Sequence, residues 1–364
     1  MPIKPPRYSI LLPGIFIFVM AGSLAEAAQL TWNGFASFYG QKSFTSDVYD
    51  LGLPQDKTDF SNGTKVGLNL RADFADNWSL IGQLLAAQRT LGFNNNSPPI
   101  WGPEYDWVYL NYDPTNEINV RVGRQIFPGS LTAEYTDVGL ALPWRRLPIQ
   151  FYTLVQFKSF EGISGAYQLK LGADTLSIRL FGGDSRPDQE DGLNFVYQIN
   201  DLSGFTLSFE GNGWRVQATA AQFYYVPIIP SPGITLQTNL GKYIEAGGKY
   251  DKNNIVAYLE YIDSECGTGS TVCYGRGYYG TLGYRLGNFM PNFTYAYAEN
   301  NFNTGFVELT SNIAGVNFQL NPSMVLKAEY LMEQGLNNAT PGGINYISAS
   351  GVARSVSVGL DLVF

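Results

Sequence analysis

The sequence of 364 residues contains no histidine, and this absence removes several kinds of chemistry at once. Without imidazole there is no Ser-His or Cys-His nucleophile, no His-ligated metal and no histidine general base. Two cysteines are too few for a disulfide scaffold and cannot complete a zinc finger without histidine. We therefore expect a protein that is not an enzyme, with no metal site and no cofactor.

Charge is also scarce, because Asp, Glu, Lys and Arg together make up only 15% of the chain. The net charge is −8 and the pI is near 4.7, which argues against nucleic acid as a partner. Hydrophobic residues (45%) and aromatic residues (15%) are too abundant for a disordered chain. The 40 glycines, 24 tyrosines and 23 phenylalanines favour strands over helices.

Long hydrophobic runs are confined to the N-terminus. Two basic residues precede an apolar stretch at 10–24, and an Ala-Glu-Ala site ends at Ala27. We predict a Sec-type signal peptide over residues 1–27, cleaved on export. The alternative is a single membrane helix, but the run is shorter than the usual span of about 20 residues and Pro13 interrupts it.

Export places the two cysteines in an oxidising compartment. Cys266 and Cys273 flank a segment rich in Gly, Ser and Thr, and they could close a small loop as a disulfide. Two independent free thiols are the alternative.

The remaining residues, 28–364, alternate between apolar and polar positions. Between residues 64 and 74, for example, every second residue from Val66 to Phe74 is apolar. Only residues 105–112 are apolar at both parities, so their orientation stays open. The strands are joined alternately by short turns and by longer polar segments. The turns lie near 75, 114, 173, 212, 252, 287 and 321, and the longer segments lie near 42–62, 89–104, 127–160, 184–203, 225–238, 263–275, 299–309 and 334–351.

This layout predicts about sixteen strands in an all-β, antiparallel, up-and-down transmembrane β-barrel, with short turns at one rim and long loops at the other. The apolar face repeatedly ends in aromatic residues beside the short turns, as expected at a lipid–water interface. The opposite face is rich in charged and amide side chains, which a water-filled lumen accommodates without a desolvation cost. The interfacial aromatic residues are Phe74, Trp78, Phe209, Trp214, Tyr250, Tyr284, Phe289 and Phe318.

The C-terminal segment 357–364 alternates polar and apolar residues and finishes on Phe364. In this it resembles the terminal signal of the Gram-negative outer-membrane porins, a family whose layout the chain from 28 to 364 also matches. Weaker similarities are the strand end at 122–125 and the strand at 327–330. The resemblance implies that Gly359, Leu362 and Phe364 are read by the barrel-assembly machinery. It also implies a homotrimer in contact with outer-membrane lipid and lipopolysaccharide.

The resemblance further implies that the third long loop, residues 127–160, folds into the lumen and narrows it. The Leu-Ala-Leu-Pro-Trp sequence at 140–144 suits a loop buried against a wall rather than one in water. By resemblance, acidic loop residues face a basic wall. Arg124 has outward parity unless a bulge intervenes, and the positive charge of Arg145 and Arg146 leaves the ion preference open. The candidates are Glu134 and Asp137 on the loop and Arg71, Arg121, Arg124 and Arg215 on the wall.

The sequence therefore favours an outer-membrane porin that passes small hydrophilic solutes and ions by passive diffusion. One alternative is a substrate-selective channel for a sugar or small organic acid, with Trp144, Tyr135 and Tyr152 forming an aromatic track. The others are a barrel enzyme, which the missing histidine disfavours, and a surface adhesin or receptor that binds through its long loops.

Overall fold

The computed structural model describes residues 29–44, 58–60, 63–89, 100–155, 157–185, 197–227, 238–266, 273–302, 305–337 and 352–364. The predicted signal peptide, residues 1–27, lies outside the described residues.

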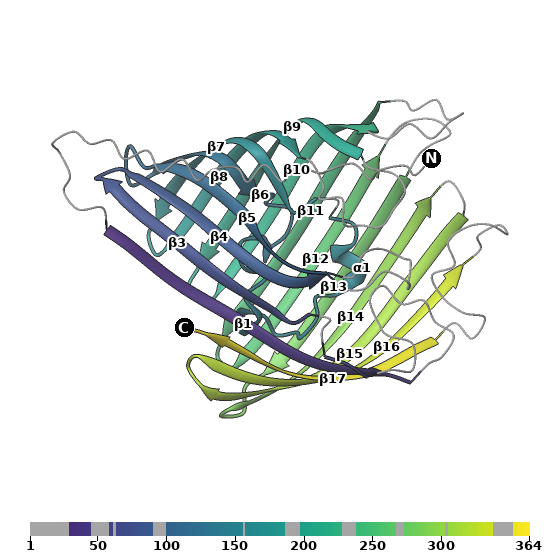
Figure 1. Cartoon of the computed structure of the whole chain (residues 1–364). Coiled ribbons are helices and arrows are strands. Elements are labelled where there is room, and N and C mark those ends of the chain that lie inside the picture. The colour runs from purple at the N-terminus through teal and green to yellow at the C-terminus, as the bar shows by residue number, and fades with distance from the viewer. Residues whose placement is uncertain are drawn as a thin grey trace, which may run out of the picture.

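The described strands form one antiparallel sheet that closes on itself, because β1 pairs with β17 on one side and with β3 on the other (Figure 1). One strand, β2, is only two residues long, and it pairs with the end of β1. Without it the barrel has the sixteen strands that the sequence predicts, each paired with its neighbour along the chain. The strands are β1 (Gln29–Ser43), β2 (Thr58–Asp59), β3 (Lys65–Ala75), β4 (Trp78–Arg89), β5 (Ile100–Tyr112), β6 (Ile118–Ile126), β7 (Ser159–Leu171), β8 (Asp174–Ser185), β9 (Tyr197–Gly211), β10 (Trp214–Pro227), β11 (Asn239–Lys252), β12 (Ile255–Cys266), β13 (Cys273–Tyr284), β14 (Phe289–Phe302), β15 (Gly305–Asn321), β16 (Met324–Asn337) and β17 (Val352–Val363).

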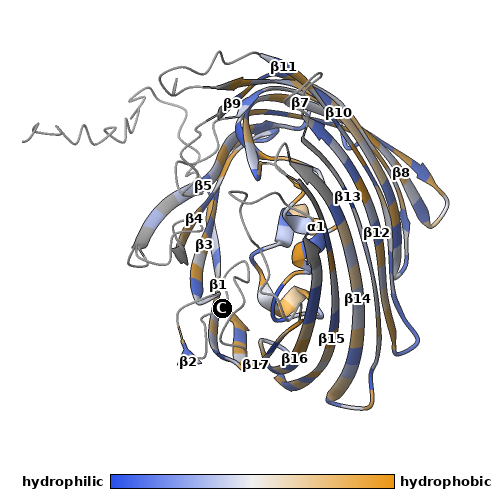
Figure 2. Cartoon of the chain, turned by 90° about the vertical axis from the view of Figure 1, so that its right-hand side faces the viewer, coloured by the Kyte–Doolittle hydropathy of each residue, from blue (hydrophilic) through white to orange (hydrophobic). Residues whose placement is uncertain are grey.

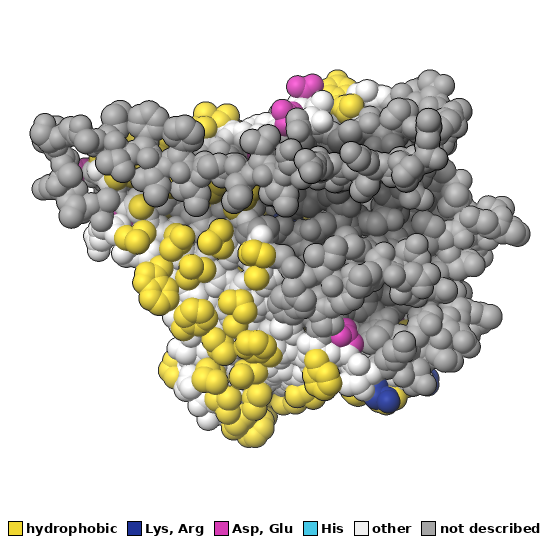
Figure 3. Space-filling view, in the orientation of Figure 1, with side chains coloured by type: hydrophobic (Ala, Val, Ile, Leu, Met, Phe, Trp, Pro, Cys, Tyr) yellow, Lys and Arg dark blue, Asp and Glu magenta, His cyan; other side chains and the backbone are white. Residues whose placement is uncertain are grey.

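The outer face of the barrel is apolar and uncovered. Leu180, Leu259 and Leu282 are 61%, 63% and 63% exposed, and all three occupy the apolar parity of their strands. In the view of Figure 3, hydrophobic side chains gather over the outer wall and charged ones lie near its margins. A continuous apolar belt around a closed barrel is the surface that a bilayer covers, since closure leaves no unpaired strand edge in lipid.

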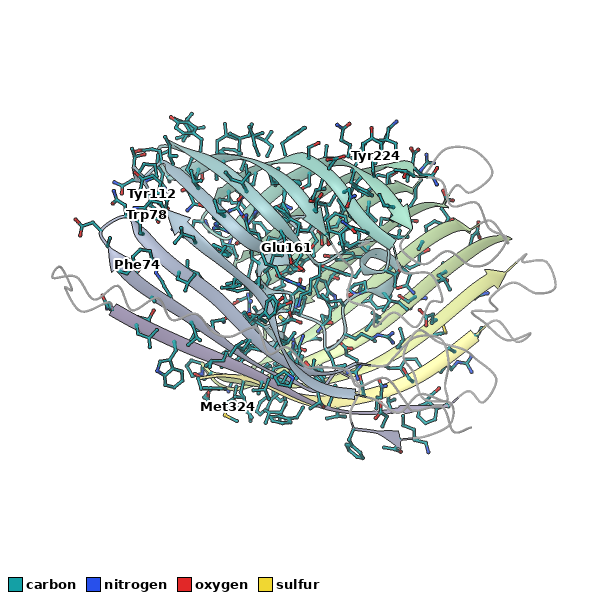
Figure 4. All side chains as sticks on the ribbon, turned by 45° about the horizontal axis from the view of Figure 1, so that its top comes forward. Phe74, Trp78, Tyr112, Glu161, Tyr224 and Met324 are labelled. Carbon is teal, nitrogen blue, oxygen red and sulfur yellow. The ribbon has the colours of Figure 1, made fainter. Side chains whose placement is uncertain are left out.

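Aromatic side chains mark the short-turn end of this belt. Trp78 stacks on Tyr112 with ring centroids 4.3 Å apart, and Phe289 packs on Phe318 at 4.6 Å. Figure 4 shows Phe74, Trp78 and Tyr112 together at one end of the barrel, whereas Tyr224 lies at the other end. The predicted interfacial ring is therefore present as neighbouring pairs on adjacent strands.

The structure changes two details of the predicted layout. The segment 299–309 was expected to be a long loop, but β14 extends to Phe302 and β15 begins at Gly305. The ambiguous stretch 105–112 contains a β-bulge, because Gln83 pairs with Trp107 while the next residue of β4 pairs with Tyr105. The extra residue reverses the parity within the strand, so apolar residues occupy both parities.

Three short helices interrupt the segment between β6 and β7: η1 (Ala133–Tyr135), η2 (Gly139–Ala141) and α1 (Ile149–Tyr152). Figure 2 shows α1 and the chain around it inside the ring of strands. Within the described ranges, no helix is sufficiently long and apolar to cross a membrane.

Candidate functional site: the constriction of the lumen

The third long loop, predicted at 127–160, folds into the lumen as expected, and it ends earlier because β7 already begins at Ser159. Its apolar side chains pack against inward-facing aromatic and aliphatic side chains of the wall strands. Trp144 and Phe151 are completely buried there, and burial of each such side chain contributes roughly 1.5–3 kcal/mol. The loop is thus a second layer inside the barrel wall. The wall residues of this cluster include Phe181, Phe223, Tyr243, Tyr258, Ile262 and Tyr279.

Polar side chains of the wall also hold this loop through its backbone carbonyl groups. The Lys327 ammonium is buried and donates to the carbonyl oxygens of Gly139 (2.6 Å), Leu142 (2.8 Å) and Trp144 (2.8 Å). It also forms an ion pair with Asp361 at 3.0 Å. A buried ammonium with a carboxylate and three carbonyl partners compensates much of its desolvation cost. We call Lys327, Asp361 and these three carbonyl groups the loop lock.

The loop lock is continuous with the seam where the barrel closes. Asp361 lies on β17 and accepts hydrogen bonds from Ser37 and Tyr39 on β1. A Cβ atom at Gly139 would lie 2.0 Å from Asp361 Oδ1, so only glycine permits this close approach. Closure of the barrel and docking of the loop therefore use the same carboxylate.

Other buried acids hold the back of the loop. Glu260 Oε1 accepts a hydrogen bond from the Leu131 amide at 2.7 Å, and Glu329 Oε1 accepts one from the Arg145 amide. Glu260 is fully buried and Glu329 is 8% exposed. Carboxylates in these positions serve as acceptors for the loop backbone and do not face the open lumen. Further buried inward-facing acids are Glu245, Glu333 and Asp361.

Asp137 belongs to this structural set, although it was predicted to face the pore. It forms ion pairs with Lys65 at 3.1 Å and Lys158 at 2.6 Å, and Lys158 also contacts Asp106 at 2.7 Å. Burial raises the pKa of Asp137, but the two ammonium groups outweigh this effect and hold the pKa well below its usual range. Its charge is therefore neutralised within the loop and against β3.

Glu134 lies on the opposite side of the loop and is the acid that faces the basic wall. Its carboxylate is 3.5 Å from Arg121 Nη1 and 3.6 Å from Arg179 Nη2, and its side chain is 59% exposed. Enclosure by the protein raises the pKa of Glu134. Arg179 and Arg121 lower it by more than enclosure raises it, so the net shift is downward. Arg215 acts on Glu134 in the same direction.

The wall opposite Glu134 carries the basic arc, which we define as Arg121 on β6, Arg179 on β8, Arg215 on β10 and Lys249 on β11. The Arg121 guanidinium lies over the Tyr109 ring at 5.0 Å. Lys249 lies over Tyr135 of the loop at 5.1 Å. In the described residues two carboxylates contact the four basic groups of the arc, Glu134 from the loop and Glu210 beside Arg215, so positive charge is in excess there.

Two of the inward-facing arginines also have acidic partners near the short turns. Arg71 on β3 pairs with Asp73, two residues further along the same strand, at 2.8 Å. Arg215 of the basic arc is 3.8 Å from Glu210 on the neighbouring strand β9. The role of Arg71 at the constriction stays a prediction.

Three other predicted constriction residues serve different roles. Arg124 pairs in register with Val108 on the outer face, and its guanidinium lies over Tyr105 at 5.3 Å. It therefore lies outside the lumen, as its parity indicates. Arg145 donates to Gln41 Oε1 at 2.8 Å and anchors the loop to β1. Arg146 lines the narrow space between the loop and β15–β17.

Two of the three aromatic side chains of the predicted track are buried behind the loop. Trp144 is 0% exposed and donates its indole N–H to Thr281 and Thr294, both at 2.9 Å. Tyr152 contacts Thr132 at 2.6 Å. These two side chains hold the loop, whereas the third, Tyr135, is half-buried beside Lys249 of the basic arc.

Sequence reasoning missed Arg179 and Lys249 as constriction residues, although the inward parity of Arg179 was readable. It also missed Lys65, Lys158 and Lys327 as partners of the loop. No local pattern reports these pairings, since the partners lie on strands far apart in the sequence.

The two remaining predictions concern ends of strands. The backbones of Cys266 and Cys273 are register partners at the end of the β12–β13 ladder, and their disulfide stays a prediction. Gly359 on β17 faces inward, where a Cβ atom would overlap the Tyr39 ring. Leu362 is the register partner of Met324 on β16, and the Phe364 amide donates a hydrogen bond to the Gly34 carbonyl oxygen. Recognition of this strand by an assembly machinery also stays a prediction.

Comparison with known proteins identifies the fold. The sequence matches no protein-family model and no curated protein. Similar solved structures include the outer membrane channel DcaP of Acinetobacter baumannii, with a TM-score of 0.61 and 13% identity over 95% of this chain and 100% of that chain. An anion-selective porin from Comamonas acidovorans has a TM-score of 0.58 and 12% identity, covering 93% of this chain and 100% of that chain. OmpF of Salmonella typhi has a TM-score of 0.58 and 14% identity, covering 93% and 98%. Identities this low show a shared barrel fold.

Proposed function

We propose that this protein is a passive channel of the outer membrane for small hydrophilic solutes and that its constriction favours anions. The observation that carries the proposal is the arrangement of the basic arc opposite Glu134, the single loop carboxylate that faces it. The barrel has an apolar outside and a charged inside, and a loop narrows its lumen. These features support a water-filled path with a size limit and an electrostatic filter.

The mechanism combines sieving and charge. The loop packs against wall strands from β8 to β17, and Glu134 and Tyr135 on its front face the basic arc, which borders the remaining water path. The buried acids behind the loop, such as Glu260 and Asp361, are 0% exposed and act on the loop rather than on ions in the water path. An anion therefore meets an excess of positive charge at the narrowest region, although the whole chain carries a net charge of −8.

The barrel fold supports an outer-membrane location, reached by export with the predicted signal peptide, and a homotrimeric assembly. Cross-linking of the protein in native membranes tests the assembly, with a ladder ending at three subunits expected. A single band at the mass of one subunit would contradict it.

Liposome swelling tests the transport function directly. Vesicles containing the protein should admit small neutral sugars, and they should admit an organic anion faster than an organic cation of similar size. Equal rates for the two charged solutes would favour an unselective pore. No swelling with any solute would contradict a channel.

A further inference from the structure

We propose that Arg121, Arg179 and Arg215 form a binding site for a carboxylate or phosphate, and that Glu134 fills this site as an internal counter-ion until a permeating anion displaces it. The inference rests on the proposed channel function and adds a specific site to it. The three arginines come from β6, β8 and β10, whereas Glu134 comes from the loop, so the two halves of the site belong to different layers.

The contacts of Glu134 are long for charge-assisted hydrogen bonds. Its distances of 3.5 Å to Arg121 and 3.6 Å to Arg179 exceed the roughly 2.7–2.9 Å of a close guanidinium–carboxylate pair. Both contacts use the same carboxylate oxygen, Oε1, so neither is a bidentate pair. An anion that reaches two guanidinium groups at close range therefore binds in better geometry than Glu134 does.

The exposure of the partners shows which half of the site is fixed. The side chains of Arg121 and Arg179 are each 21% exposed, whereas that of Glu134 is 59% exposed. Asp137, three residues further along the loop, is 16% exposed and has contacts of 2.6 Å and 3.1 Å. Asp137 is thus held by its partners, and Glu134 extends into water, where an ion pair contributes little to stability.

Two of the three arginines keep their positions through contacts other than Glu134. Arg121 donates from Nε to Asn119 Oδ1 at 2.9 Å and lies over Tyr109. Arg215 donates to Gln217 Oε1 at 2.6 Å. These two guanidinium groups therefore stay in place when Glu134 moves away, and this preorganisation lowers the cost of binding an anion.

The chemistry of the site selects the ligand class. Guanidinium groups bind planar carboxylates and tetrahedral phosphates through two oxygens, which a chloride ion does not offer. A small solute with two negative charges, such as inorganic phosphate, satisfies two arginines at once. We therefore expect carboxylated and phosphorylated solutes to pause at this site while chloride passes.

The test measures single-channel current as chloride is replaced by inorganic phosphate. Wild-type current should saturate with phosphate, and in E134Q the half-saturating phosphate concentration should fall about two- to fivefold, the range expected when a weak exposed pair is removed. The double variant R121Q/R179Q, which leaves one arginine of the site, should abolish saturation while the pore stays open. D73N is the matched control, because it removes one lumen carboxylate beside Arg71, and its half-saturation should equal that of the wild type.

An unchanged or higher half-saturating concentration in E134Q would overturn the inference, as would saturation that persists in the double variant R121Q/R179Q. A protein that is anion-selective in potassium chloride but shows no phosphate saturation would contradict the binding site alone. A protein that forms no pore, or one selective for cations, would contradict the proposed function itself.

Discussion

The two faces of the constriction loop use charge in opposite ways. On the back, carboxylates such as Glu260 and Asp361 are buried and accept hydrogen bonds from the loop or from β1. On the front, the basic arc meets a lumen in which Glu134 is 59% exposed. Buried acids, together with Lys327, therefore hold the loop in position, and under the proposed function the basic arc sets the potential of the pore. Net charge alone does not reveal this division, because it counts both faces together.

Breaking the back of the loop at Lys327 should have the largest effect. The variant K327M leaves Asp361 buried without its ammonium and leaves three loop carbonyl groups without a donor. Loss of one partner of a buried ion pair costs about 3–5 kcal/mol. We expect a lower unfolding free energy in denaturant titrations and a larger, noisier single-channel current.

The matched control is K170M, which removes an exposed lysine that contacts Thr175 near a short turn. The control should keep wild-type stability and current noise. A single-channel current of wild-type amplitude in K327M would show that the loop lock does not position the constriction.

A smaller change on the same face is G139A. The added methyl group would meet Asp361 Oδ1 at 2.0 Å, so the turn at η2 must move away from β17. Overpacking of this kind costs about 1–3 kcal/mol. Denaturant titration should show this loss, and conductance should rise less than in K327M. G165A on β7 is the matched control, because its Cβ position has open space and its φ is not positive, so stability and conductance should stay at the wild-type values.

The front of the loop is tested by the double variant R121Q/R179Q. Removal of two guanidinium groups leaves Glu134 without its nearest partners and removes two of the four positive charges of the basic arc. We expect the anion preference to fall by severalfold in permeability ratio, with little change in unfolding free energy, because partly exposed pairs contribute roughly 0.2–1 kcal/mol each. A permeability ratio equal to that of the wild type would place the filter elsewhere.

The smallest expected effect is the pH dependence of selectivity. The pKa of Glu134 is lowered, so its carboxylate is charged at neutral pH and becomes protonated only at a pH below its usual value near 4.5. Protonation removes the negative charge beside the arc, so anion preference should rise as the pH falls through this acidic range. Glu134 also loses its ion pairs in this range. A carboxylate whose pKa is depressed in the folded state stabilises that state only while it is charged, so its contribution disappears as the pH falls through the pKa. The pH dependence should disappear in E134Q, and its persistence there would assign it to another acid.

Much of the fold could be predicted from the sequence, since the period of two, the alternation of turns and loops, and the aromatic ends such as Trp78 and Phe289 are local signals. The orientation of residues 105–112 could not, because a bulge opposite Gln83 changes the parity. The inward loop was predicted correctly because Trp144 and its apolar neighbours do not suit a loop in water.

Charge pairing at the site was harder to predict. Parity shows that Arg121 and Arg179 face the lumen, but it does not show that they share Glu134. The same reasoning treated Glu134 and Asp137 alike, although Lys65 and Lys158 neutralise only Asp137. Such differences depend on contacts between distant strands and the loop, which no local pattern encodes.

The proposed function requires an excess of positive charge along the water path, with the buried inward-facing acids such as Glu260 and Asp361 behind the loop. This can be measured as the reversal potential of the purified wild-type protein in a planar bilayer, under a gradient of potassium chloride at neutral pH. We expect the sign given by a channel that is more permeable to chloride than to potassium. The opposite sign would rule out an anion-selective constriction.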